Sequence, residues 1–296
     1  MLRPEQMSKV SVTGTRAILE DFIEAIHDQN VVHLSDYDGN IEGFDHGNPT
    51  ESADAAAEKL VTVRSVQSIL GVTEEDAGPT RIVTDEALDD QLERIRSEVN
   101  ELDEERSALE DEYREMEERI EAADPFVELG IDLEYLSGYD NLEVAVGEAE
   151  AEPVQDALAR GDNIRAYDVF EGEDIVAAFV YPSKGHENVI DDALVGVDFT
   201  HVEVPNASGS PEDYIADLQR ERAKLERNIE ELEAELEALR LEHADFLLAA
   251  EEKLTIEVQK AEAPLQFATT QRAFVGEGWI PTSDYTEFAS AIRDAL

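Results

Sequence analysis

Two long heptad tracts constrain this chain more than any other feature of its sequence. In each tract, apolar side chains recur alternately four and three residues apart, and the positions between them are mostly charged. This spacing is typical of helices that pack against a partner helix along one seam. Because a single chain must run out and return, we expect an antiparallel two-helix coiled coil over 85–124 and 210–263. Its expected core positions are Leu88, Leu92, Ile95, Val99, Leu102, Leu109 and Ile120 in the first tract, and Ile215, Leu218, Leu225, Ile229, Leu232, Leu236 and Leu239 in the second.

Local signals place the ends of these helices. Asp85 opens the first tract, and Pro125 predicts its end because proline disfavours helix at the residue before it. Ser210 predicts an N-cap for the second helix, with Pro211 at the first helical position. Pro264 predicts the end of that helix.

Three polar side chains interrupt the heptad stripes. Arg106 and Arg222 either snorkel or pair with neighbouring carboxylates, and so set the register of the coiled coil, or they form a flexible point at which the rod bends; the first interpretation is favoured. His243 also occupies a heptad position, where it either tunes helix pairing or packs beside the rod.

A separate folded module is expected between the two tracts, over 125–209. After a short helical stretch, its pattern alternates between strands and helices in the order β-α-β-β-α-β, with a hairpin turn at 171–173. That order is the ferredoxin-like split βαβ arrangement. Strands are expected at 142–146, 164–170, 175–181 and 199–204, and helices at 126–136, 153–160 and 187–195.

The two ends of the chain predict a second ferredoxin-like lobe, formed by 1–84 together with 264–296. Its last strand is expected to be missing, because the pattern stops after the second helix of the motif. The predicted fold class is therefore α+β, a dumbbell of two ferredoxin-like lobes joined by the coiled-coil rod. The expected strands are 10–12, 31–34 and 272–275, and the expected helices begin at 15, 51 and 282.

The charge of the chain excludes several partners. With 72 acidic and 23 basic residues, the formal net charge is −49. Nucleic acid is excluded as a direct partner because phosphate binding needs a basic face. Such evenly spread acid, with few lysines, predicts a cytoplasm of very high salt, in which carboxylates barely repel one another. No apolar stretch is long enough to predict a membrane span.

No pattern for catalysis, a cofactor or a metal stands out. The chain has no cysteine, and its six histidines show no close ligand spacing. With 72 carboxylates, two acids near each other in sequence indicate nothing about acid–base chemistry. We therefore expect no catalytic, cofactor-binding or metal-ligating residue. Trp279, the only tryptophan, is expected in the core of its lobe, with a partner-facing anchor as the alternative.

Four local strings, in this order around an inserted module, resemble one family. They are MLRPEQM at 1–7, VHLSD at 32–36, FVELGIDL at 126–133 and FVGEGWIP at 274–281. The chain resembles the N-terminal cytoplasmic domain of subunit a, also called subunit I, of archaeal and vacuolar-type rotary ATPases. The resemblance covers essentially the whole sequence.

The resemblance implies a non-catalytic stator role at the cytoplasmic face of the cell membrane. It implies that both lobes hold peripheral-stalk heterodimers of E and G or H type subunits. It also implies that the distal lobe, 125–209, lies near the central-stalk subunit of C or d type. In the family an ion-translocating membrane domain follows, and this sequence does not contain it. The alternative is a coiled-coil-linked module that senses a ligand or binds other proteins through ferredoxin-like lobes.

Overall fold

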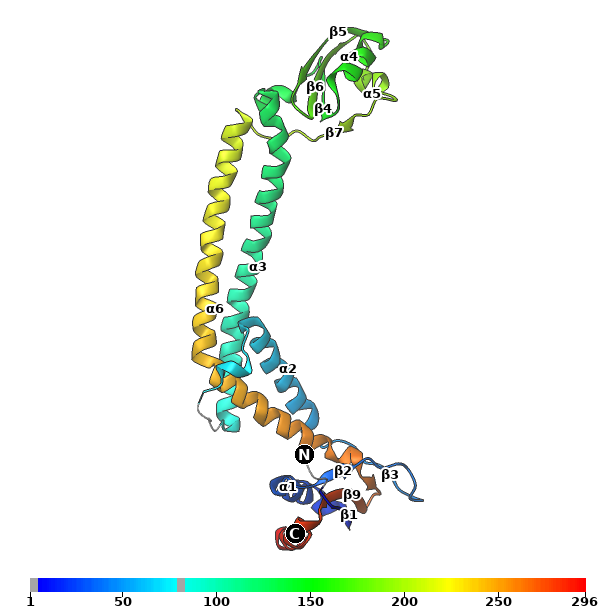
Figure 1. Cartoon of the computed structure of the whole chain (residues 1–296), viewed down its shortest axis with the longest axis vertical. Helices are drawn as coiled ribbons and strands as arrows, with labels where there is room; N and C mark the ends of the chain where they lie inside the picture. The colour runs from blue at the N-terminus through cyan, green and yellow to red at the C-terminus, as the bar shows by residue number, and fades with distance from the viewer. Residues whose placement is uncertain (1–4, 79–82) are drawn as a thin grey trace. The chain divides into compact units, whose positions relative to one another are not determined.

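The computed structural model describes residues 5–78 and 83–296, which divide into two compact units. Unit 1 comprises residues 1–101 and 236–296, and unit 2 comprises residues 102–235. Two long helices, α3 (Asp85–Leu129) and α6 (Pro211–Glu262), each contribute residues to both units (Figure 1). The fold is α+β, with long helices and two antiparallel sheets.

The sheet of unit 1 is organised around β9 (Ala273–Pro281). All its pairings are antiparallel, and β9 lies between β1 on one side and both β2 and β8 on the other. The pairing of β1 with β9 runs through all nine residues of each strand. The remaining strands of this sheet are β1 (Met7–Thr15), β2 (His33–Ser35), β3 (Asp45–His46) and β8 (Ala268–Thr269).

One face of this sheet packs against α1 (Leu19–Gln29) and α7 (Tyr285–Ala295). Alternate residues of β9 are buried, as expected for a strand with one covered face. Phe274 lies at the centre of the core, its ring centroid 5.2 Å from that of Phe22. Short 3₁₀ turns at Arg16–Ile18 and Thr282–Asp284 lead into the two helices.

A third helix in unit 1, α2 (Ala53–Leu70), joins the two long helices. Lys59 of α2 lies 2.5 Å from Asp89 of α3, and Arg64 lies 2.8 Å from Glu251 of α6. The apolar face of α2 is buried over Leu60, Val63, Val66 and Leu70. Gly71 ends the helix in a left-handed conformation, which glycine adopts at little cost. The sequence predicts this helix but not its packing against the other two.

Unit 2 contains a four-stranded antiparallel sheet in the order β5-β6-β4-β7. Helices α4 (Ala151–Arg160) and α5 (Val189–Ala193) cover one face, and the end of α3 with a 3₁₀ turn at Leu133–Leu136 covers part of the other. Along the chain the elements follow the predicted order β-α-β-β-α-β. The strands are β4 (Glu143–Glu148), β5 (Ile164–Glu171), β6 (Ile175–Pro182) and β7 (Thr200–His201).

Several predicted boundaries are wrong. Helix α3 continues through Pro125 to Leu129, because Phe126 and Leu129 are buried against the sheet of unit 2 and this burial outweighs the lost backbone hydrogen bond. The last strand of unit 2 has two residues rather than six. The strands β3 and β8 were not predicted, since two-residue strands leave no periodic pattern.

Candidate functional site

The seam between the long helices is tightly packed in unit 1. Here Leu88, Leu92, Ile95 and Val99 of α3 are at most 5 % exposed, and Leu236 of α6 is equally buried. Leu239 is half-buried. Ion pairs join α2 to both long helices in this region, from Lys59 to Asp89 and from Arg64 to Glu251. Apart from Leu239, the predicted seam positions of unit 1 are therefore buried.

Lys253 fastens the start of α3 to α6. Its ammonium donates to the carbonyl oxygen of Val83 at 3.1 Å and pairs with the carboxylate of Asp85. The hydrogen bond with Lys253 lowers the pKa of Asp85, and the same bond raises the pKa of Lys253. The carboxylate also lies at the N-terminus of α3, where negative charge is favourable. This contact fixes how the two helices meet.

Arg240 forms a second link in unit 1, between α6 and the loop after α2. Its guanidinium lies 3.1 Å from Asp76 and 2.6 Å from Glu237. The backbone N–H of Thr73 donates to Asp76 and, together with Arg240, lowers the pKa of that carboxyl. Nearby, the N–H of Gly78 donates to the carboxylate of Asp245 at 2.6 Å. These contacts hold the loop against α6.

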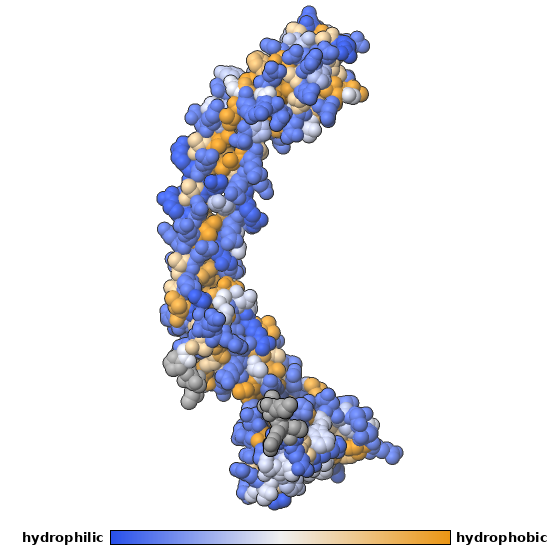
Figure 2. All heavy atoms as spheres, in the orientation of Figure 1, coloured by the Kyte–Doolittle hydropathy of each residue, from blue (hydrophilic) through white to orange (hydrophobic). Residues whose placement is uncertain are grey.

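The seam is more open in unit 2. Ile215, Leu218 and Leu232 are buried, whereas the other predicted core positions of this unit, Leu102, Leu109, Ile120, Leu225 and Ile229, are only half-buried. Two helices alone cannot enclose every seam residue, and Figure 2 shows hydrophobic residues along α3 and α6 on an otherwise mostly hydrophilic surface. The guanidinium of Arg119 donates to the hydroxyl of Tyr214 at 2.9 Å. This contact joins the last part of α3 to the first part of α6, as antiparallel pairing requires.

Both seam arginines pair with carboxylates, as the favoured interpretation predicts. Arg106 lies 2.5 Å from Asp103 and 3.5 Å from Glu110 on its own helix. Arg222 lies 3.6 Å from Glu117 on the opposite helix, with its guanidinium carbon 5.9 Å from the centre of the Tyr113 ring. The Nε atoms of Arg106 and Arg222 are buried without a hydrogen-bond acceptor in the described part of the chain. A buried donor without an acceptor lowers stability, because its lost hydration is not replaced.

His243 is buried in the seam of unit 1, with 6 % of its surface exposed. Its Nε2 lies 3.8 Å from the carboxylate of the neighbouring Glu242, which is mostly exposed. The histidine therefore packs as part of the helix seam.

Trp279 lies on the surface, so the expectation that it belongs to the core is wrong. It is 40 % exposed on β9, on the face of the sheet opposite α1 and α7. In the sheet register it lies between Lys9 of β1 and His33 of β2. The alternation of β9 decides this, because Gly278 and Ile280 on either side are buried and Ile280 belongs to the core. The position suits the alternative prediction of a partner-facing anchor.

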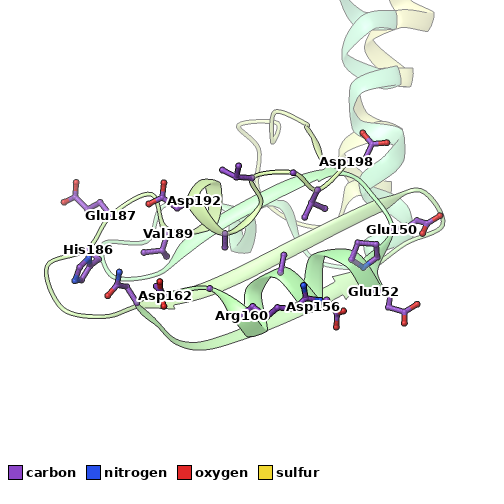
Figure 3. A pocket seen from close by; sticks show the side chains of 18 residues that line it. Glu150, Glu152, Asp156, Arg160, Asp162, His186, Glu187, Val189, Asp192 and Asp198 are labelled. Carbon is purple, nitrogen blue, oxygen red and sulfur yellow. Dashed lines mark hydrogen bonds and ion pairs between the residues drawn. The ribbon is translucent and has the colours of Figure 1, made fainter.

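Unit 2 carries a hollow of about 970 Å³ beside α4 and α5. Figure 3 shows its labelled side chains, most of which are carboxylates. The only arginine in the lining, Arg160, is 2.7 Å from Asp156 and so is already paired. Such a lining repels phosphates and other anions. Its carboxylates are Glu150, Glu152, Asp156, Asp162, Glu187, Asp192 and Asp198.

Unit 2 also exposes aromatic side chains that the sequence did not single out. Phe170 and Tyr181 are each more than 40 % exposed, and the Phe170 ring meets the Phe179 ring edge-on at 5.4 Å. Both strands that carry them lie at one side of the sheet, where β5 is the edge strand. Alternate residues of β5 lie on opposite faces of the sheet. The sequence could therefore have predicted that Phe170 is exposed only if the face covered by other elements were already known.

Within the described ranges 5–78 and 83–296, no group of three or more histidine or acidic residues is placed to hold a metal ion. Over the same ranges, no helix has the length and apolar character needed to cross a membrane.

Comparisons with known proteins give a consistent relationship. No family model matches the chain. The A-type ATP synthase subunit I of Halobacterium salinarum is 57% identical over 296 residues, which is all of this chain and 41% of that protein. The A-type ATP synthase subunit I of Archaeoglobus fulgidus is 28% identical over 293 residues, covering 97% of this chain and 43% of that protein. The chain thus spans about two fifths of the length of these curated relatives.

A solved structure shares the fold. It is described as the cytoplasmic N-terminal domain of subunit I, homolog of subunit a, of V-ATPase, and it matches with a TM-score of 0.53 and 17% identity. The match covers 97% of this chain and 96% of that one. Along its entire length the chain is therefore similar to part of an A-type ATP synthase subunit I, and it shares the fold of the cytoplasmic N-terminal domain in that solved structure.

Proposed function

We propose that this chain is a non-catalytic stator part of an A-type ATP synthase, the arm that connects the membrane part of subunit I to the peripheral stalks. The observation that carries the proposal is the 57% identity over all 296 residues to an A-type ATP synthase subunit I. In a rotary machine, a stator must resist the torque that the rotor exerts while ions pass. The proposed work of this chain is therefore mechanical, and the chemistry of the complex takes place in other parts.

The packing of the long helices supports a mechanical role. In unit 1 the seam is closed, with Ile95 and Val99 fully buried and ion pairs at Lys253 and Arg240. Close packing resists deformation because interiors have low compressibility. In unit 2 five of the eight predicted seam positions are only half-buried, and the seam contains Arg106 and Arg222, each with an unsatisfied Nε. We propose that these two arginines set helix register and that the looser packing around them lets the arm bend under load.

The proposed partners are peripheral-stalk heterodimers of E and G or H type subunits, which bind both units, and a central-stalk subunit of C or d type near unit 2. The location is the cytoplasmic face of the cell membrane. Trp279 is the proposed anchor for the partner of unit 1, since a large exposed aromatic side chain contributes strongly when a partner buries it.

A binding experiment tests this proposal. The 296-residue chain is mixed with the recombinant peripheral-stalk heterodimer in 3 M KCl, and binding is measured by titration calorimetry. We expect a saturable interaction that Trp279→Ala weakens at least tenfold. Tyr285→Ala is the matched control, because this aromatic side chain is 50 % exposed on α7 of the same unit. No binding from 0.5 to 4 M salt would argue against the stator role, and equal effects of the two substitutions would remove Trp279 from the interface.

The finer architecture is also proposed. The lobes, 1–84 with 264–296 and 125–209, are ferredoxin-like, and the helices of 85–124 and 210–263 form the rod of a dumbbell. The strand order β5-β6-β4-β7 supports this description for unit 2. Small-angle X-ray scattering in high salt should then show a distance distribution with a long tail. A single symmetric peak would contradict the dumbbell.

The acidic hollow bears on the alternative of a ligand-sensing module. Its seven carboxylates and single paired arginine disfavour nucleotides and other anionic effectors. A melting temperature that stays constant when ATP or amino acids are added would agree with the stator proposal, whereas a saturable increase would favour the sensor.

A further inference from the structure

The outer edge of β1 is an unusually regular pairing surface. Two hydrogen bonds that flank the strand fix its phase against β9, namely Thr282 N–H to the Gln6 carbonyl at 2.8 Å and Arg16 N–H to the Arg272 carbonyl at 3.0 Å. In an antiparallel ladder, hydrogen-bonded and non-hydrogen-bonded pairs alternate. Even-numbered residues of β1 therefore bond to β9. The odd-numbered residues Met7, Lys9, Ser11 and Thr13 direct their N–H and C=O groups away from it.

Those outward groups have no partner strand among residues 5–78 and 83–296. In that part of the chain, β1 pairs only with β9. Its side-chain exposure alternates strictly, with Val10 and Val12 packed toward α1 and α7 and the odd-numbered residues exposed. The strand pairs with β9 without a register shift over nine residues, which is long for a strand left open to solvent.

The edge also carries little of the charge that usually protects an open strand. Exposed edges are commonly blocked by charged side chains or proline, which prevent unwanted pairing. In a chain with 72 acidic residues, β1 has none, and its only charge, Lys9, lies 2.7 Å from Glu277 of β9. This composition is expected of a strand that is paired on both sides.

Unit 2 shows which strand would occupy the equivalent place. There the first strand, β4, lies between β6 and β7, and β7 is the strand that follows the second helix. Unit 1 repeats the same order, with β1, α1 and β2 first and then β9 and α7, and β9 lies between β1 and β2. Thus β1 corresponds to β4. The side of β4 that β7 occupies corresponds to the open side of β1.

We propose that the edge of β1 binds an extended segment of the same polypeptide placed after α7, as a strand antiparallel to β1. Its apolar side chains would alternate toward α1 and α7, continuing the face of Val10 and Val12, with polar side chains on the face of Lys9. The curated relatives supply the room for such a segment, since this chain spans only 41% to 47% of their lengths. The inference concerns completion of the unit 1 sheet and does not depend on the stator role.

Amide hydrogen exchange measured by NMR tests this pairing. The 296-residue chain is compared in 3 M KCl with a chain extended by the next twenty residues that its gene encodes. We expect exchange at Lys9, Ser11 and Thr13 to slow at least tenfold in the extended chain. Val10 and Val12 should be protected in both chains, since their amides bond to β9, and they serve as internal controls.

Three results would overturn the proposal. The first is unchanged exchange at the odd-numbered amides in the extended chain, and the second is a gene that ends at Leu296. The third is protection that already exists in the 296-residue chain and rises with its concentration, which would identify a second copy as the occupant.

A substitution gives an independent check. Ser11→Pro removes one outward N–H without touching the bonds to β9, so in the extended chain it should restore fast exchange at Lys9 and Thr13. Ser11→Ala is the matched control and should leave the protection intact. Protection at Val10 and Val12 reports whether either variant still forms β1. Equal protection of Lys9 and Thr13 in the two variants, with β1 intact, would contradict the proposed strand.

Discussion

The closed seam of unit 1 predicts a large cost for shortening Ile95. Ile95 is fully buried on α3, and Ile95→Ala removes three carbon atoms from this core. At about 0.8 kcal/mol per buried methylene, the lost transfer free energy is about 2.4 kcal/mol. The cavity that remains adds to this, so we expect the free energy of unfolding to fall by about 3–4 kcal/mol. Leu241→Ala removes the same number of carbons from a side chain that is 71% exposed on α6. This substitution should change the free energy of unfolding by less than about 0.5 kcal/mol.

Urea unfolding in 3 M KCl measures both variants. Trp279 is the only tryptophan and lies in unit 1, so its fluorescence follows that unit while circular dichroism at 222 nm follows all helices. With a slope of about 3 kcal/mol per molar urea, Ile95→Ala should lower the fluorescence midpoint by about 1 M. If Ile95→Ala and Leu241→Ala shift the midpoint equally, the conclusion that Ile95 lies in a closed core is refuted.

Three further predictions address other parts of the molecule. Lowering the salt from 3 M to 0.1 M KCl lengthens the screening distance to about 10 Å, so the carboxylates repel one another and the helicity measured by circular dichroism should fall. A melting temperature that stays unchanged over this range would show that the acidic composition is not an adaptation to salt. Ser210→Ala should cost about 1 kcal/mol in urea unfolding, because the Ser210 hydroxyl accepts from the Asp213 N–H at 3.1 Å; Ser208→Ala is the control. The pKa of Asp85 is lowered in the folded state, so its contribution is present above about pH 4 and is lost as pH falls through the folded pKa. The stability difference between the unmodified chain and Asp85→Asn should therefore shrink between pH 6 and 3, and a constant difference would exclude this linkage.

The sequence by itself determined the long helices and most of the seam. A heptad repeat is a local pattern, and burial of one stripe follows wherever a partner helix lies, as at Leu88 and Leu218. The order of strands and helices in unit 2 was likewise readable, because each element carries its own period and turn residues. The N-cap at Ser210 follows from residue type alone.

Only the tertiary structure decided which of these surfaces are closed and which are open. The packing of α2 against α3 and α6 depends on contacts between residues far apart in sequence, such as Lys59 and Asp89, and no local pattern encodes them. The continuation of α3 through Pro125 depends on burial of Phe126 against a sheet formed later in the chain. Trp279 is exposed because the register of β9 directs its neighbours inward, and a one-residue shift would have buried it. Local periodicity specifies the elements, whereas burial depends on what the rest of the chain brings to each face.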